Sequence, residues 1–140
     1  MTESVHFVVP GIPRGKERPR IGKVAGRAIA FTPPKTRSEE GAVRMFAAAA
    51  MADRPPMEGP LEMRLLARTM IPASWPVKKQ NSALAGDIKP TGRPDLSNIT
   101  KLYEDGMNGI VWKDDAQVVS LSVQKIYSHT PNIEIYVAKI

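Results

Sequence analysis

The sequence predicts a small α/β domain of the α+β kind, in which two main helices pack on one mixed β-sheet in the order β-(β)-α-β-α-β-β. Two observations support this prediction. Several short segments alternate apolar and polar residues, which is typical of strands with one buried face. Two other segments repeat apolar residues at helical spacing. The 140 residues fit one domain over 1–140.

The N-terminal half begins with a strand over 5–9, where Val5, Phe7 and Val9 alternate with their neighbours before a Pro-Gly turn. A short extended piece follows over 28–31. Thr36-x-x-Glu39 then resembles a capping box and predicts the start of a helix, which Arg54-Pro55-Pro56 stops. The apolar face of this helix comprises Val43, Phe46, Ala47, Ala50 and Met51.

The C-terminal half begins with a clearly alternating strand over 61–71. A long loop over 72–94 follows, with a helical turn near 78–84. We expect a second helix from Pro94 to Asn108-Gly109. Its core-facing residues are Leu96, Ile99, Tyr103 and Met107. Two final strands over 119–123 and 133–137, joined by a turn at 128–132, predict an antiparallel hairpin with one apolar face on each strand.

Composition excludes several classes of protein. The chain has no cysteine, so it has neither disulfides nor thiolate metal sites. No apolar run is long enough to span a membrane, and the N-terminus does not resemble a signal peptide. We therefore expect a cytoplasmic protein without a membrane partner or an organic cofactor.

Positive charge is concentrated in the segment 14–37, which has eight basic residues and only Glu17 as an acid. Its net charge of +7 exceeds the +6 of the whole chain. Clustered Lys and Arg favour a polyanionic partner such as nucleic acid, since they neutralise phosphates. The alternative is a solvated loop whose charge aids solubility.

Acidic residues are concentrated in the segment 93–117. If the second helix forms, Asn98, Lys101 and Asp105 share one side of it, with Asp95 at its start. Asp114 and Asp115 come just before a strand. Carboxylates that converge from two elements suit Mg²⁺, which needs one or two of them together with a substrate phosphate. Metal-dependent hydrolysis of a phosphodiester is the chemistry that this arrangement favours.

Each of these residues also has a simpler interpretation. Asp95 suits a helix N-cap, and Asp114-Asp115 suits an exposed turn. Lys101 is spaced to pair with Asp105 on a helix surface. Trp112 is interpreted as a core residue rather than a surface on which bases stack.

Three motifs resemble the RusA family of Holliday junction resolvases, which is common in phages and prophages. The first is Gly11-Ile-Pro13-Arg-Gly-Lys16-Glu-Arg18-Pro19-Arg20. The second is Thr32-Pro33-Pro-Lys35-Thr36-Arg37. The third combines Pro94-Asp95-Leu-Ser97-Asn98-Ile-Thr-Lys101, Asp105 and Trp112-Lys-Asp114-Asp115-Ala-Gln117. The resemblance covers nearly the whole chain, with the motifs in the family's order.

The resemblance implies a homodimeric endonuclease that cuts branched DNA with Mg²⁺, with Mn²⁺ as an alternative. It assigns metal binding to Asp95 and Asp115, with Asp114 beside them, and a catalytic role to Lys101. The DNA-binding residues that it implies are Arg14, Lys16, Arg18, Arg20, Lys35 and Arg37.

Ser97 departs from the family pattern, which has an aspartate at this position. A hydroxyl is a poorer ligand for a hard cation than a carboxylate is. Three explanations remain open. Ser97 binds the metal directly or through water; Glu104, Asp105 or Asp87 substitutes for the missing carboxylate; or the protein binds junctions without cutting them.

The main alternative to a nuclease is thus a non-catalytic protein that binds branched DNA. A basic scaffold or an RNA-binding protein is a further alternative. That alternative predicts aromatic stacking surfaces, but aromatic residues are only 6% of the chain.

Overall fold

The computed structural model describes residues 3–17, 20–31 and 33–140. For Arg20 it describes the backbone but not the side chain. The strands are β1 (Ser4–Pro10), β2 (Arg20–Val24), β3 (Arg27–Phe31), β4 (Leu61–Met70), β5 (Val118–Ser128) and β6 (Asn132–Lys139). The helices are α1 (Pro34–Met51), α2 (Val77–Leu84), α3 (Leu96–Met107) and the short 3-10 helix η1 (Asp115–Gln117). The predicted α+β class is confirmed, and α2 lies inside the predicted loop over 72–94.

The main sheet has the strand order β1-β6-β4-β5. β4 is antiparallel to β6 and parallel to β5, so the sheet is mixed, as predicted. The predicted hairpin of the last two strands is wrong, because β5 and β6 lie on opposite sides of β4. Met70 is in register with Ser128 and Arg68 with Asn132, so the link over 129–131 passes across the end of β4.

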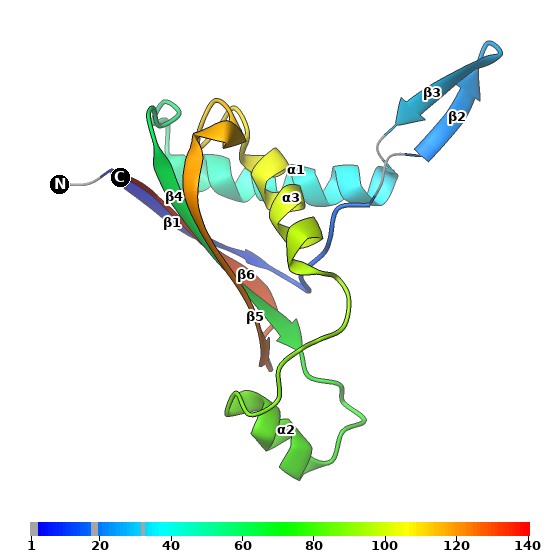
Figure 1. Cartoon of the computed structure of the whole chain (residues 1–140), viewed down its shortest axis with the longest axis vertical. Coiled ribbons are helices and arrows are strands. Elements are labelled where there is room, and N and C mark those ends of the chain that lie inside the picture. The colour runs from blue at the N-terminus through cyan, green and yellow to red at the C-terminus, as the bar shows by residue number, and fades with distance from the viewer. Residues whose placement is uncertain (1–2, 18–19, 32) are drawn as a thin grey trace.

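One face of the main sheet is covered by α1 and α3 (Figure 1). β4 supplies the centre of the core, and its alternating residues Leu61, Met63, Leu65 and Ala67 are all buried. The apolar faces predicted for both helices are confirmed except at Leu96, since the other residues that they comprise are buried in this core or packed against it, whereas Leu96 is only half-buried. None of the helices in the described ranges is long and apolar enough to cross a membrane.

β5 differs from the prediction in its burial. The alternation over 119–123 predicts a buried apolar face, but Val119 is 64% exposed and Leu121 is 51% exposed. β5 is an edge strand of the main sheet, and the two covering helices leave this part of it bare. Alternation correctly predicts a strand here, but burial depends on what packs against it.

The start of α1 also corrects a prediction. The helix begins at Pro34, and its N-cap Pro33 forms no side-chain capping bond, so the capping box of Thr36 and Glu39 is absent. Proline suits the first helical position because its missing N–H has no partner there in any case. Thr36 is buried in the first turn instead, and its Oγ1 accepts a hydrogen bond of 3.1 Å from the Glu17 N–H. Thr36 therefore ties the basic segment to α1.

The hairpin β2–β3 projects from one end of the molecule, and α2 lies at the opposite end (Figure 1). The sequence predicted only an extended piece over 28–31, which is close to β3. Every residue of β3 is exposed. The hairpin therefore places Lys23 and Arg27 away from the body of the protein.

The two covering helices meet at Gly106 of α3. A Cβ atom at this position would lie 2.7 Å from the Cβ and Cγ1 atoms of Val43 and 3.3 Å from the backbone oxygen of Glu40. Contacts this short require movement of the packed α1 backbone or of the stiff Val43 side chain. Gly106 thus permits the close contact between α1 and α3.

We expect Gly106→Ala to lower the free energy of unfolding by about 1–3 kcal/mol, the usual cost of overpacking. Gly41→Ala in α1 is the matched control, because a Cβ atom there meets nothing within 4 Å. Removing a glycine from the helix interior should make the control more stable by about 0.5–1 kcal/mol. Urea unfolding of both variants measures the difference, and equal stabilities would contradict the packing described for Gly106.

Candidate active site

The turn over 112–117 is fixed by two side chains. Trp112 is fully buried, as predicted, and its Nε1 donates a hydrogen bond of 2.6 Å to Asn108 Oδ1. Gln117 Nε2 donates to the backbone oxygens of Met57 (2.9 Å) and Gly59 (3.1 Å). Gln117 Oε1 accepts from two backbone N–H groups of the turn, at 3.0 and 3.2 Å. These bonds set the path of the turn that presents Asp114 and Asp115.

The two aspartates of this turn have different surroundings. Asp114 caps η1, and its Oδ1 accepts a hydrogen bond of 3.0 Å from the Ala116 N–H. This bond and the neighbouring Asp115 carboxyl lower the pKa of Asp114. Asp115 is half-buried, and its Oδ2 lies 3.7 Å from Lys101 Nζ. Asp115 is therefore the aspartate that faces α3.

One face of α3 includes Lys101, the residue that contacts Asp115. Ser97, Lys101 and Glu104 follow one another at spacings of four and three residues, so they lie on the same side of the helix. Lys101 Nζ also lies 3.3 Å from Asp105 Oδ1. The hydrogen bond and charge of Asp105, together with the charge of Asp115, raise the pKa of Lys101. Lys101 therefore remains a cation at neutral pH.

Glu104 places a second acidic group near Asp115. Burial raises the pKa of Glu104, and the negative charge of Asp115 raises it further. Two carboxylates from separate elements therefore repel each other beside Lys101. A divalent cation would relieve that repulsion, and Mg²⁺ needs only one or two carboxylates in addition to phosphate oxygens. The donor chemistry of Glu104 and Asp115 thus suits a hard metal ion.

The basic segment reaches this centre through Lys16. Its ammonium group forms an ion pair with Asp105 and lies 3.2 Å from Glu40 Oε1. Burial alone would lower the pKa of Lys16, but the bonds and charges of Asp105 and Glu40 raise it overall. Lys16 was predicted to contact DNA. In this structure it joins the basic segment to α1 and α3.

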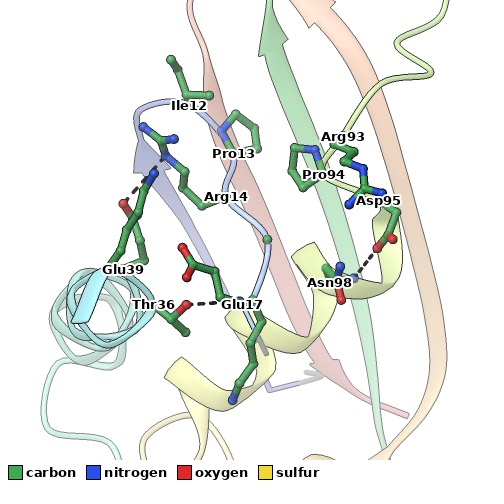
Figure 2. A pocket seen from close by; sticks show the side chains of 13 residues that line it. Ile12, Pro13, Arg14, Glu17, Thr36, Glu39, Arg93, Pro94, Asp95 and Asn98 are labelled. Atoms are coloured by element: carbon green, nitrogen blue, oxygen red, sulfur yellow. Dashed lines mark hydrogen bonds and ion pairs between the residues drawn. The ribbon is translucent and has the colours of Figure 1, made fainter. Parts of the chain in front are cut away.

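Close packing at Gly15 brings the same segment against the start of α3. A Cβ atom on Gly15 would lie 2.8 Å from Pro94 Cβ and 3.1 Å from Asn98 Cβ. The Lys16 N–H donates a hydrogen bond of 3.0 Å to the backbone oxygen of Asn98. An open pocket of about 780 Å³ lies between the segment 12–17 and the first turns of α1 and α3 (Figure 2).

Asp95 lines this pocket. Its Oδ1 caps α3 by accepting a hydrogen bond of 2.9 Å from the Asn98 N–H (Figure 2). The simpler interpretation of Asp95 as an N-cap is therefore confirmed. Lys125 of β5 fixes the preceding turn by donating to the backbone oxygens of Gly92 (2.8 Å) and Pro94 (3.1 Å).

The predicted metal ligands do not form one cluster. Within the described ranges, no three acidic or histidine side chains lie close enough to hold a metal together. In the same part of the chain, no hydrogen bond or ion pair joins Asp95 to Asp114 or Asp115. The structure does bring Asp115 to Lys101, with Glu104 nearby. The helical spacing of Ser97, Lys101 and Glu104 was the sequence signal for that third residue.

The predicted DNA contacts occupy different positions. Lys35 and Arg37 are exposed in the first turn of α1. Arg14 borders the pocket, with its Nε 3.9 Å from Glu39 Oε1. Arg18 lies outside the described residues, as does the side chain of Arg20. Lys35 lines the pocket and places exposed positive charge there, and Arg37 follows two residues later on α1.

The fold and the site together define a small α+β protein with a cationic surface and a lysine–carboxylate centre. The family model described as Endodeoxyribonuclease RusA matches residues 10–138. The chain is also 32% identical over 142 residues to the uncharacterized protein YqaN of Bacillus subtilis (strain 168), a match that covers 99% of this chain and 98% of YqaN. The chain belongs to the RusA endodeoxyribonuclease family, which confirms the resemblance. Members of this family are nucleases that bind branched DNA junctions and generally depend on a divalent metal.

We expect Gln117→Ala to lower the free energy of unfolding by about 1–3 kcal/mol, because backbone groups in the turn lose their hydrogen-bond partners. Lys78→Ala on exposed α2 is the control and should change stability by less than about 0.5 kcal/mol. Urea unfolding compares the two variants. If Gln117→Ala is as stable as the control, the turn does not depend on these bonds.

Proposed function

We propose that this protein is a structure-selective endodeoxyribonuclease that resolves Holliday junctions and other branched DNA by Mg²⁺-dependent phosphodiester hydrolysis, in DNA recombination and repair. We further propose that it acts as a homodimer, because two symmetric cuts require two sites. The contact of 3.7 Å between Lys101 Nζ and Asp115 Oδ2 is the main support, since it joins two parts of the third motif, one on α3 and one in the turn before β5.

Asp115 is the proposed central metal ligand, and Glu104 is the proposed substitute for the carboxylate missing at Ser97. Glu104 lies on the same helix face as Ser97 and Lys101, and the negative charge of Asp115 raises the pKa of Glu104. Of the other substitutes considered, Asp105 already pairs with Lys16 and Lys101. Asp87 lies in the segment that follows α2. These differences favour Glu104 among the three.

Asp95, Asp114 and Ser97 remain proposed contributors to the site. Their support is their position in the third motif alone, because Asp95 and Asp114 form caps and Ser97, in the first turn of α3, stands where the family has an aspartate. A bound metal would activate water and offset the charge that develops on the phosphate. Lys101, held as a cation, would add a second positive charge to that phosphate.

The basic segment 14–37 is the proposed DNA-binding surface. Lys35 and Arg37 are exposed in the first turn of α1, and Lys23 and Arg27 lie on the projecting hairpin. The sequence has no acidic residue between Glu17 and Glu39. This continuous positive charge suits the phosphate backbone of DNA, whichever base sequence it has.

One alternative has specific support. A branched-DNA-binding protein without nuclease activity would tolerate Ser97 in place of the family's aspartate. Within the described part of the chain no three acidic or histidine side chains gather to hold a metal, which also favours this alternative. The same DNA binding is expected in both cases, so only a cleavage assay distinguishes them.

We expect Asp115→Asn and Glu104→Gln to abolish or strongly reduce Mg²⁺-dependent nicking of a synthetic four-way junction. Lys101→Ala should reduce the rate about a hundredfold, as when one charge-stabilising group is removed. Ser97→Asp should lower the Mg²⁺ concentration needed for half-maximal nicking, because a carboxylate is added to the site.

Asp53→Asn, away from the proposed site, is the matched control for charge loss and should retain the wild-type rate. Junction binding measured without Mg²⁺ should survive in all of these variants. An unchanged rate in Asp115→Asn would refute the proposed site. A wild-type rate and Mg²⁺ midpoint in Glu104→Gln would refute only the substitution of Glu104 for the missing carboxylate.

We also expect Lys35→Ala/Arg37→Ala to reduce the salt dependence of junction binding. Each lost phosphate contact should lower the slope of log K against log salt by about one unit. Lys78→Ala/Lys79→Ala on α2 is the matched double control, because α2 lies at the end opposite the hairpin. Titration at several salt concentrations gives the slopes. Equal slopes in both double variants would remove Lys35 and Arg37 from the DNA interface.

A further inference from the structure

β5 leaves an unusual stretch of sheet edge bare. Within the described residues it is the last strand of the main sheet, so only β4 pairs with it. The seven residues 118–124 have no charged side chain and no proline. Val119 and Leu121 are exposed, and Val123 is half-buried. Long edge strands usually have a charge, a proline or a cover, because a bare edge pairs readily with another chain.

The exposed side chains of β5 extend the core face of the sheet. Leu121 is in register with Met63 of β4, and Val123 with Leu65, both of which are buried beneath the helices. The apolar strip of Val119, Leu121 and Val123 therefore continues the hydrophobic face beyond the cover of α1 and α3. Burying this strip would be favourable in proportion to the apolar area removed from water.

We propose that the second copy of this chain covers the strip, with the two β5 strands pairing antiparallel about a two-fold axis at Leu121. This inference rests on the homodimer of the proposed function and names its interface. A two-fold interface must be self-complementary. The apolar strip is symmetric about Leu121, so Val119 would lie opposite the partner's Val123. The uncharged stretch 118–124 is centred on the same residue.

The charges that flank the strip support the same pairing. At one end the strip is followed by Lys125, which donates a hydrogen bond to the turn that contains exposed Arg93. At the other end the strip is preceded by Asp114 and Asp115. Antiparallel pairing about Leu121 brings the basic end of each copy toward the acidic end of the other. A pairing centred on Lys125 would instead oppose two lysines.

The neighbouring structure limits the pairing to this stretch. Beyond Lys125, the ring of Trp75 packs against Tyr127 with centroids 5.4 Å apart, so the segment before α2 already covers the end of β5. DNA is a poor fit for the bare part, because residues 118–124 offer no cation to a phosphate. A second copy of the same uncharged strip is the better match.

The test uses the full chain with Leu121→Asp, which would place two carboxylates together at the two-fold axis. We expect the wild type to sediment at about twice 15.4 kDa at micromolar concentration and the variant to sediment as a monomer. Met45→Asp is the matched control on α1, where the native side chain is 63% exposed, and it should remain dimeric. A dimeric Leu121→Asp would overturn the inference.

A second variant keeps the test decisive if Leu121→Asp does not fold. The chain has no cysteine, so Leu121→Cys introduces a single thiol. Residues directly opposite in an antiparallel pair lie close enough for a disulfide. We expect mild oxidation to cross-link Leu121→Cys into a covalent dimer and to leave Met45→Cys monomeric in denaturing gels. Absence of the cross-link would overturn the inference.

A junction-cleavage assay on the wild type separates the two proposals. Cleavage by a protein that dimerises through another surface refutes this interface alone. A β5-paired dimer that cuts no branched DNA refutes the nuclease and leaves the interface standing.

Discussion

The position of α3 depends on close packing at two glycines. At Gly106 the helix contacts α1 where a methyl group would collide with Val43, and at Gly15 the basic segment contacts the start of α3 with equally little space. These contacts fix the helix on two sides. Lys101 therefore faces the turn of Asp115, and the pocket beside Asp95 lies next to the basic segment. The arrangement of the whole site depends on this one helix.

Local sequence patterns predicted most elements of the fold but not all their partners. Alternation identified β4 and β6, because each has one face in the core. The short turn after β5 suggested a hairpin, yet both strands pair with β4 instead. A turn fixes where the chain reverses, whereas the pairing depends on which strand buries its apolar face in the core. Thr36 likewise has the residue type of a cap but forms a tertiary hydrogen bond.

The candidate site was predictable in composition and only partly in geometry. The motifs identified Asp115 and Lys101, which the structure brings together. Asp95 precedes Lys101 by six residues, a rise of about 9 Å along a helix, so membership of one motif does not imply one cluster. The pairing of Lys16 with Asp105 joins residues distant in the sequence, and no local pattern indicates it. Trp112 and Gln117 stabilise the turn that presents Asp115.

The central claim is that the lysine–carboxylate centre beside a cationic surface hydrolyses branched DNA. The most direct measurement incubates the wild-type protein with an end-labelled four-way junction and with a linear duplex of the same arm sequence, in Mg²⁺ and in EDTA. The proposed mechanism predicts paired nicks in opposite strands of the junction in Mg²⁺, and intact DNA in the other three conditions. A junction that is bound but not cut at any concentration of Mg²⁺ or Mn²⁺ would contradict it.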